Sequence, residues 1–283
     1  MEQLGPIDTL GHFPGERAAL IELLEALTPE DWSKPTVCAG WNVHDVTLHL
    51  LFTDMTYLSR HRDGFFGSRA VDTGDLNDPA VLLAFINAQN DGWVKGAQRV
   101  SPRLIIDFLR LVGDQLSEFR KALDLSAPGG VVSWAGPERA PVWMDVAREY
   151  TEKWHHQQHI RDAVGKPGLL DRQWCHPVLD TFARALPFAL HSERPATGTT
   201  VALEVTGDAG DVWLAAREVA GWTLGRGSAE EAAAAASRVT MDQDTAWRLF
   251  TKGIAPEKAA EQIAIDGDPN LACRVLRMVT IIA

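Results

Sequence analysis

Up to about residue 165, apolar residues recur three and four positions apart along the chain. This spacing places them on one face of a helix. It is clearest in the stripe Ile105, Phe108, Leu109, Val112, Leu116, Phe119 and Leu123. We predict a first helix over residues 14–27 and four long helices over residues 43–61, 79–98, 102–123 and 142–164. Long helices joined by short or medium links favour an antiparallel four-helix bundle.

Beyond Pro195 the apolar residues alternate with polar ones, which is typical of strands. Strands are predicted over residues 199–205, 211–217, 221–225, 238–242 and 262–265. Helices are expected at 174–191, broken near Pro187, at 244–251 and at 270–281. The predicted fold class is therefore α followed by α+β. Residues 1–168 form the helical bundle, and residues 169–283 form a linking helix and a small α+β domain.

Two links carry Gly, Pro and Ser and are predicted to be loops, at residues 64–78 and 127–137. Asn42 and Asp45 have the spacing of an N-cap and its reciprocal partner at a helix start. Trp41 is expected to wedge this helix start into the core. Cys38 has no base adjacent in sequence and is interpreted as a small buried residue.

Composition narrows the possible functions. The chain has 283 residues, 46% of them hydrophobic, and a formal net charge of −11. Nucleic acids and anionic membranes require basic surfaces, so neither is expected as a partner. No apolar run approaches the roughly 18 residues of a membrane helix, and no signal-peptide pattern opens the chain. Three cysteines without C-x2-C spacing indicate neither disulfides nor a thiolate zinc site. We expect a cytoplasmic protein.

The densest group of possible metal ligands lies between residues 148 and 165. Glu152, His156 and His159 share one stripe of a helix, while His155 and His159 form a second pair one turn apart. Two ligands one turn apart hold a divalent ion well. Both registers stay open, and a solvated helix face is the alternative without a metal.

A third ligand must come from another helix. His49 lies beside the apolar face of the predicted helix 43–61, so a facing helix could bring it to the cluster. Two imidazoles and one carboxylate leave a position for water or substrate, which is typical of a catalytic ion. A hydrogen-bonded core histidine is the alternative interpretation of His49.

Two motifs carry a family resemblance. Residues 36–50, TVCAGWNVHDVTLHL, look like the signature T-x-C-x-G-W-x-V-x-D-x-x-x-H-L, and Arg148, Glu152 and His156 fall on the pattern R-x3-E-x3-H. Both resemble the N-terminal domain of mycothiol-dependent maleylpyruvate isomerases, in the DinB/YfiT-like metalloenzyme superfamily. The resemblance implies that His49, Glu152 and His156 are metal ligands. Position 159 is more often Asp in that family, and the wider superfamily often uses H-x3-H, which leaves the ligand set of this helix open.

The resemblance also implies a chemistry. A DinB-like bundle would bind a divalent metal, for which zinc suits a donor set of two nitrogens and one oxygen. Mycothiol or a similar low-molecular-weight thiol would be the cosubstrate, and a small electrophile the substrate. Residues 247–253, WRLFTKG, and 267–272, GDPNLA, resemble a sterol-carrier-like C-terminal domain. The expected activity is that of a thiol S-transferase or of an isomerase that works through a thiol adduct, in a monomer or homodimer.

Four further residues are candidates for binding or catalysis. Trp134 lies in a Gly- and Pro-rich link and could form a pocket wall. Arg148 precedes Glu152 by one turn and is expected to pair with it, or to bind the cosubstrate. Arg248 and Arg274 are candidates for binding a carboxylate or the polar part of the thiol cosubstrate.

Two other functions stay open. If His159 closes a fourth ligand position, the metal is structural and the protein is a non-catalytic binding or regulatory protein. Alternatively, metal-bound hydroxide hydrolyses a small electrophile, with Glu152 or His155 as the general base.

Overall fold

The computed structural model describes residues 1–67, 75 and 78–281. These residues form two compact units, each built from separate stretches of chain. One unit contains Met1–Thr9, Asp124–Thr151 and Leu169–Ile281; the other contains Leu10–Leu123 and Glu152–Gly168. Helix α6 (Val142–Val164) begins in the first unit and ends in the second.

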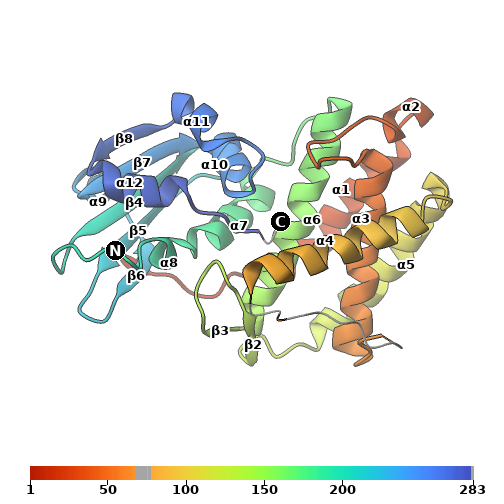
Figure 1. Ribbon diagram of the computed structural model, residues 1–283, viewed down its shortest axis with the longest axis horizontal. Coiled ribbons are helices and arrows are strands. Elements are labelled where there is room, and N and C mark those ends of the chain that lie inside the picture. The colour runs from red at the N-terminus through yellow and green to blue at the C-terminus, as the bar shows by residue number, and fades with distance from the viewer. Residues whose placement is uncertain (68–74, 76–77, 282–283) are drawn as a thin grey trace. The chain divides into compact units, whose positions relative to one another are not determined.

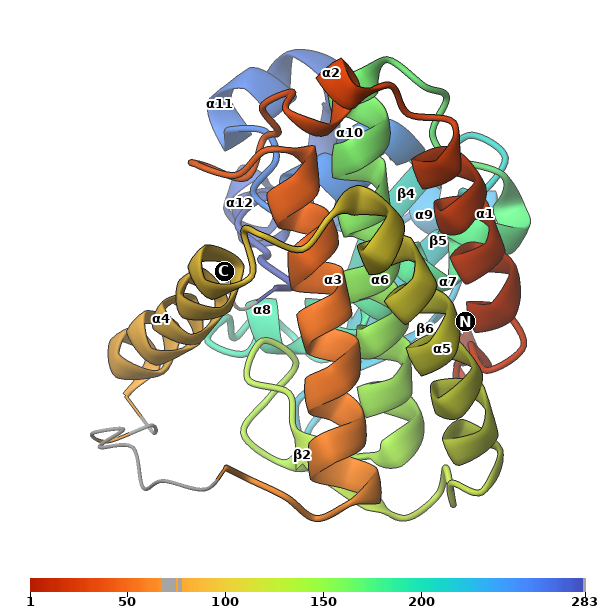
Figure 2. The ribbon, with the colours of Figure 1, turned by 90° about the vertical axis from the view of Figure 1, so that its right-hand side faces the viewer.

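The second unit is helical. It contains α1 (Phe13–Glu25), α2 (Pro29–Trp32), α3 (Val43–Tyr57), α4 (Pro79–Gly96), α5 (Pro102–Lys121) and the C-terminal part of α6. Helix α5 packs against both α1 and α3, and α4 packs against α3 (Figure 2). Their core is aliphatic, with Leu24, Val46, Leu50, Ile105 and Leu109 almost fully buried.

The start of α3 follows the predicted capping pattern. The Asp45 backbone N–H donates to Asn42 Oδ1 at 3.0 Å, and the Asn42 backbone N–H donates to Asp45 Oδ2 at 3.1 Å. The reciprocal bonds satisfy backbone donors that the helix leaves open, and they fix the first turn of α3. Beyond Tyr57 the helix widens into a π-helical turn, Leu58–Arg62.

A buried ion cluster connects three helices of this unit. Asp54 on α3 lies 2.5 Å from Arg17 on α1 and 3.0 Å from Lys153 on α6. The Asp54 side chain has no solvent exposure, and that of Lys153 has 2%. Charges this deep are tolerated because each faces an opposite charge. The cluster therefore constrains how α1, α3 and α6 pack together.

The first unit combines helices with a six-stranded sheet (Figure 1). The strands are β1 (Glu2–Gln3), β4 (Thr200–Thr206), β5 (Val212–Arg217), β6 (Trp222–Arg226), β7 (Ser237–Asp242) and β8 (Ala264–Gly267), in the order β1-β6-β5-β4-β7-β8. Among the described strands of this sheet, β4 and β7 pair in parallel, with Leu203 opposite Val239, and the other neighbours are antiparallel. Successive residues of β4 are buried, as expected for an interior strand covered on both faces.

Helices and one hairpin complete this unit. They are α7 (Arg172–Ala183), α8 (Leu186–Ala189), α9 (Ala229–Ala233), α10 (Gln243–Phe250), α11 (Pro256–Ala259), α12 (Pro269–Leu276) and the hairpin β2 (Pro128–Val131) with β3 (Arg139–Pro141). Helices α9, α10 and α12 contact the sheet. The fold is thus a mixture of helices and sheet, and the predicted helices and five C-terminal strands are confirmed.

Several details differ from the predictions. The link 127–137 contains β2, because this segment pairs antiparallel with β3, with Val131 opposite Arg139. Arg139 Nε also donates to the Gly129 carbonyl at 2.7 Å, and the Gly130 N–H donates to Asp145 Oδ2 at 2.8 Å. The break in 174–191 falls before Leu186, so that Pro187 lies in the first turn of α8, where its missing N–H is harmless. The last helix ends at Leu276. Most of the predicted loop 64–78 lies outside the described residues.

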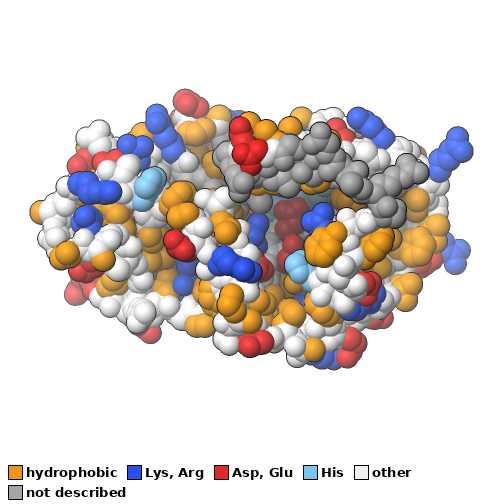
Figure 3. All heavy atoms as spheres, turned by 60° about the horizontal axis from the view of Figure 1, so that its bottom comes forward, with side chains coloured by type: hydrophobic (Ala, Val, Ile, Leu, Met, Phe, Trp, Pro, Cys, Tyr) orange, Lys and Arg blue, Asp and Glu red, His pale blue; other side chains and the backbone are white. Residues whose placement is uncertain are grey.

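On the face shown in Figure 3, the described Lys and Arg side chains are interspersed with Asp and Glu side chains. Within the described ranges, every helix is too short or too polar to cross a membrane.

Candidate functional site

Three predicted ligand residues meet inside the helical unit. His49 on α3 and His156 on α6 both direct their Nε2 atoms at one oxygen of Glu152. The distances to Glu152 Oε1 are 3.0 Å from His49 and 3.1 Å from His156. His49 and Glu152 are 103 residues apart in the chain, so the facing of α3 and α6 creates this cluster.

The surrounding rings hold the cluster in place. The His49 and His156 ring centroids are 4.7 Å apart, and the Trp41 ring lies 5.1 Å from that of His49. The His155 ring lies next to that of His156, with the centroids 4.1 Å apart and the planes tilted by 35°, and its Nδ1 is 3.9 Å from the second Glu152 oxygen. Both ligand histidines are more than nine-tenths buried, whereas 31% of the Glu152 side chain is exposed. The carboxylate is therefore the member of the cluster that solvent can reach.

Burial and neighbouring charges determine the protonation of the cluster. Burial by itself raises the pKa of Glu152, but hydrogen bonds from His156 and His49 to the carboxylate outweigh burial and hold this pKa well below its ordinary value. Burial, together with the neighbouring His155, lowers the pKa of His156 to about 3. At neutral pH the cluster therefore contains an ionised carboxylate next to a neutral imidazole with a free lone pair.

This donor set fits a divalent cation. The three donor atoms lie within 4.8 Å of one another. Nitrogen and oxygen ligands of a tetrahedral zinc ion are about 3.4 Å apart, given bond lengths of about 2.0 to 2.2 Å. The observed distances to Glu152 Oε1 are a few tenths of an ångström shorter, a difference that small side-chain movements close. Three protein donors leave one position of a tetrahedron for another ligand.

A second donor group lies at the other side of His156. Cys38 Sγ is 3.3 Å from His159 Nδ1 and 4.0 Å from His156 Nδ1. Its pKa is raised to about 11, chiefly by burial. The structure thus places His159 next to Cys38, whereas the sequence suggested His159 as a further ligand around Glu152. The sequence analysis interpreted Cys38 as a small buried residue and therefore missed this donor group. The signal available was that Cys38 belongs to the same motif as His49.

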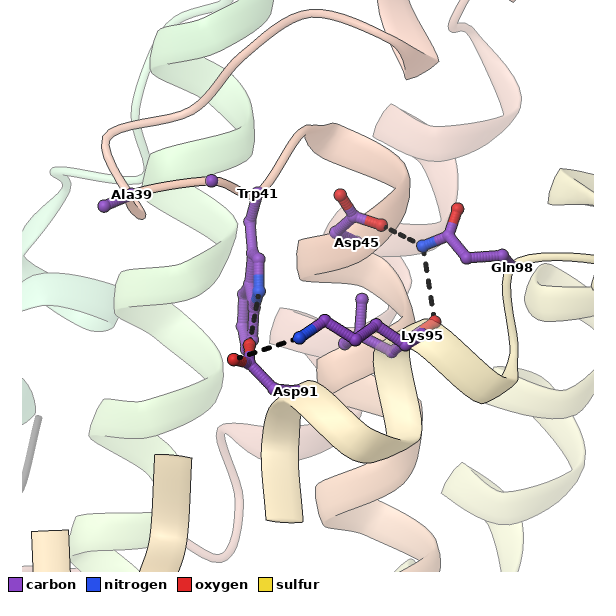
Figure 4. A pocket seen from close by; sticks show the side chains of 8 residues that line it. Ala39, Trp41, Asp45, Asp91, Lys95 and Gln98 are labelled. Carbon is purple, nitrogen blue, oxygen red and sulfur yellow. Dashed lines mark hydrogen bonds and ion pairs between the residues drawn. The ribbon is translucent and has the colours of Figure 1, made fainter. Parts of the chain in front are cut away.

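A pocket of about 280 Å³ borders Trp41 (Figure 4). It is lined by Ala39, Gly40, Trp41, Asp45, Asp91, Val94, Lys95 and Gln98. Trp41 Nε1 donates to Asp91 Oδ1 at 3.2 Å, and Gln98 Nε2 donates to Asp45 Oδ1 at 2.6 Å. Since the Trp41 ring also packs against His49, this side chain forms part of both the pocket wall and the surroundings of the cluster.

The other predicted residues lie in the α+β unit. Arg148 lies 3.6 Å from Asp145 and does not form the predicted ion pair with Glu152, because its side chain reaches back along α6. Arg248 Nε donates to Asp244 at 2.8 Å, and Arg274 Nε donates to Glu193 at 2.7 Å. Both guanidinium groups are thus engaged, and their catalytic role stays a prediction. Trp134 lies in the link that joins β2 to β3 and is partly buried, and its role also stays a prediction.

Two imidazoles and a carboxylate converge from facing helices of the helical unit. This site and fold define a class of helical proteins with a candidate cation site. The sequence profile of the mycothiol maleylpyruvate isomerase N-terminal domain matches residues 13–161, more than half of the chain, and the protein belongs to this family. The matched range contains His49, Glu152 and His156.

Solved structures agree on the fold. A crystal structure of the mycothiol-dependent maleylpyruvate isomerase matches with a TM-score of 0.54 and 9% identity, over 94% of this chain and 96% of that chain. A histidine-to-alanine mutant of that isomerase matches with a TM-score of 0.53 over the same shares, also at 9% identity. A comparison with curated protein sequences gave no match.

Proposed function

We propose that this protein is a metal-dependent enzyme that uses a low-molecular-weight thiol on a small electrophilic substrate. The convergence of His49 Nε2 and His156 Nε2 on one Glu152 oxygen, at 3.0 and 3.1 Å, carries this proposal. Membership of the mycothiol maleylpyruvate isomerase family supports the thiol part. Mycothiol is the proposed cosubstrate, and the reaction is an S-transfer or an isomerisation through a thiol adduct.

His49, Glu152 and His156 would hold the cation, for which zinc is the best match to two nitrogens and one carboxylate. A divalent cation at this point would lower the pKa of a nearby thiol and so supply a thiolate at neutral pH. Glu152 contributes the negative charge that attracts the cation, because its low pKa keeps it ionised. His156 contributes a lone pair, because its pKa of about 3 keeps it neutral.

Neighbouring side chains position these donors. Trp41 packs on His49 and is itself tied to Asp91, so the imidazole cannot swing away from Glu152 without breaking this contact. His155 lies close enough to the exposed Glu152 oxygen to exchange a proton with a ligand bound there, either directly or through one water. We infer that His155 serves the thiol or substrate and is not a metal ligand.

The proposal extends to the whole chain. Of residues 1–168, those in the helical unit would form a DinB-like antiparallel four-helix bundle, while Met1–Thr9 and Asp124–Thr151 belong to the other unit. Residues 169–283 would contain a sterol-carrier-like module, and the protein would be a cytoplasmic monomer or homodimer. Trp134 and Arg148 would contact the thiol, and Arg248 and Arg274 would bind a carboxylate after release from their ion pairs. The domain assignments rest on the family resemblance, and the residue assignments rest on the place of each residue in the sequence and on the chemistry of its side chain.

Elemental analysis of protein purified without added metal tests whether these residues bind a cation. We expect about one ion per chain in the wild type and loss of most of it in His49→Ala and His156→Ala, because each variant removes one of only three protein donors. His61→Ala, at an exposed position of the same unit, is the matched control and should keep its ion. Full retention in both ligand variants would refute the assignment.

An activity assay tests whether the reaction requires a thiol. Maleylpyruvate isomerisation, followed by absorbance, should require mycothiol and should fall by at least about a hundredfold in Glu152→Gln, since loss of the charge weakens the cation site and its chemistry together. Turnover undiminished without any thiol would instead support hydrolysis. A bound ion with no turnover of any electrophile tested would support the regulatory alternative.

A further inference from the structure

Cys38, His156 and His159 bring one sulfur and two nitrogen donors to a single point. All three donor atoms lie within 4.8 Å of one another, and His156 and His159 are more than nine-tenths buried. We propose that these residues form a second cation site, specific for a thiophilic ion, on the opposite side of His156 from Glu152. The proposal goes beyond the proposed reaction and does not depend on it.

The geometry suits a tetrahedral ion. With bonds of about 2.3 Å to sulfur and about 2.0 Å to nitrogen, a sulfur and a nitrogen ligand of a tetrahedral ion lie about 3.5 Å apart. The observed distances of 3.3 and 4.0 Å from Cys38 Sγ to the two Nδ1 atoms bracket this value. A small rotation of the Cys38 side chain would equalise the two distances, so no backbone change is required.

The loop before α3 fixes the cysteine. Thr36 Oγ1 donates to the Trp41 carbonyl at 2.8 Å and accepts from the Cys38 backbone N–H at 3.2 Å. The Trp41 N–H closes a turn onto the Cys38 carbonyl at 3.0 Å, and Gly40 supplies the positive φ of 79°. These bonds hold Cys38 against α6, 121 residues further along the chain, where His159 lies. The sulfur is thus held in place before any ion arrives, which favours binding.

The two donor groups share His156 through different nitrogens. Its Nε2 faces Glu152 at 3.1 Å, and its Nδ1 faces Cys38 at 4.0 Å. A neutral imidazole has one lone pair, on one nitrogen at a time. An ion bound at Nδ1 together with Cys38 leaves the ring proton on Nε2, which then donates to Glu152. His156 therefore cannot at the same time be a ligand of an ion held by Glu152 and His49. The kind of ion determines which donor group binds it. The thiolate of Cys38 favours soft ions, and the carboxylate of Glu152 favours harder ones.

Binding at this second site releases a proton. The Cys38 thiol is protonated at neutral pH, because burial raises its pKa to about 11. As the bond between sulfur and the ion forms, the S–H proton leaves to solvent, and the oxidation state of neither atom changes. No other reactant is needed.

Titration of the full-length protein with cadmium chloride tests the proposal, since cadmium bound to thiolate gives an ultraviolet charge-transfer band. The wild type should show this band. It should disappear in Cys38→Ser, and the cadmium dissociation constant should rise at least about tenfold in both Cys38→Ser and His159→Ala. Cys273→Ser, which removes another partly buried thiol, is the matched control and should keep the band. Circular dichroism verifies that each variant is folded.

His49→Ala separates this proposal from the proposed function. It removes a donor only from the Glu152 group, so the cadmium band should persist while metal-dependent turnover is lost. Absence of the band in the wild type, or its persistence in Cys38→Ser, would overturn the second site and leave the proposed function untouched. If the wild type gives the cadmium band and thiol-dependent turnover persists in His49→Ala, the proposed function is overturned and the second site stands.

Discussion

At the scale of single residues, the backbone conformation of Gly40 helps to position side chains of both donor groups. Gly40 lies between Cys38 and Trp41 with a φ of 79°, a conformation that other residues adopt only with strain. A Cβ at this position would meet no atom within 4 Å, so the strain is purely conformational. The turn that Gly40 allows presents the Cys38 thiol and the Trp41 ring to opposite parts of the site.

We expect Gly40→Ala to lower the free energy of unfolding by about 1 kcal/mol, because the left-handed backbone region disfavours Ala by about that amount. Urea unfolding measures the change. Gly92→Ala is the matched comparison: Gly92 is exposed inside α4 with open space around it, and Ala there should stabilise by about 0.5 to 1 kcal/mol. Equal effects of both substitutions would contradict the conformational explanation.

At the scale of helices, the buried ion cluster of Asp54, Arg17 and Lys153 decides how α1, α3 and α6 pack. An ion pair in the interior gains little net stability over apolar packing, but loss of one partner leaves a buried charge uncompensated. Since Lys153 directly follows Glu152, the same contact also fixes the rotation of α6 that presents Glu152 to His49.

Asp54→Asn should destabilise the helical unit by about 3 to 5 kcal/mol at neutral pH, because two buried cations lose their counter-charge. Denaturant unfolding followed by circular dichroism measures the loss. The matched control is Asp107→Asn, whose exposed carboxylate lies 3.8 Å from Arg110, and it should change stability by less than about 0.5 kcal/mol. Similar losses for both variants would disprove a special role of Asp54.

The same cluster makes stability depend on pH. Burial raises the pKa of Asp54, but the charges of Arg17 and Lys153 outweigh it and lower this pKa below the ordinary value. The unfolded chain therefore takes up this proton at a higher pH than the folded chain. The Asp54 contribution is complete above the ordinary carboxyl pKa of about 4 and is lost as the pH falls below it.

Urea unfolding at several pH values should accordingly show a decline in stability between about pH 5 and 3, and a shallower decline in Asp54→Asn. Glu16 acts in the opposite direction, since burial raises its pKa, so Glu16→Gln should make the decline steeper. An unchanged slope in both variants would show that other groups control the acid response.

At the scale of the whole molecule, the chain divides into two compact units, and both donor groups lie in the helical one. A ligand that binds only the folded form stabilises it by mass action, by about 2.7 kcal/mol at a hundred times its dissociation constant. Local unfolding is suppressed most in the elements that contact the ligand.

Hydrogen exchange can therefore locate the cation. Added zinc should slow exchange in α3 and in the C-terminal part of α6, and should leave the strands β4, β5 and β7 nearly unchanged, because the donors all lie in the helical unit. His49→Ala should abolish the protection at low zinc concentration. Protection centred on the sheet would place the cation elsewhere.

Much of the local structure could be predicted from the sequence. The apolar periods located the helices and strands, and the spacing of Asn42 and Asp45 identified the start of α3, because these features depend on neighbours within one or two turns. Short elements such as β1 and β2 were missed. Strand β1 has two residues and pairs with β6, more than 200 positions further along the chain, and β2 is a short strand of an irregular hairpin whose Gly- and Pro-rich composition is typical of a loop.

The sequence by itself determined which residue types are available for chemistry: a Glu and several histidines at helical spacing, and a cysteine and His49 in one motif. Only the tertiary structure decided their partners. It directed Arg148 to Asp145, His159 to Cys38, and the two nitrogens of His156 to different neighbours. The physical reason is that spacing along a helix fixes only which side chains share a face. The packing of α3, α6 and the loop between α2 and α3 determines what that face meets.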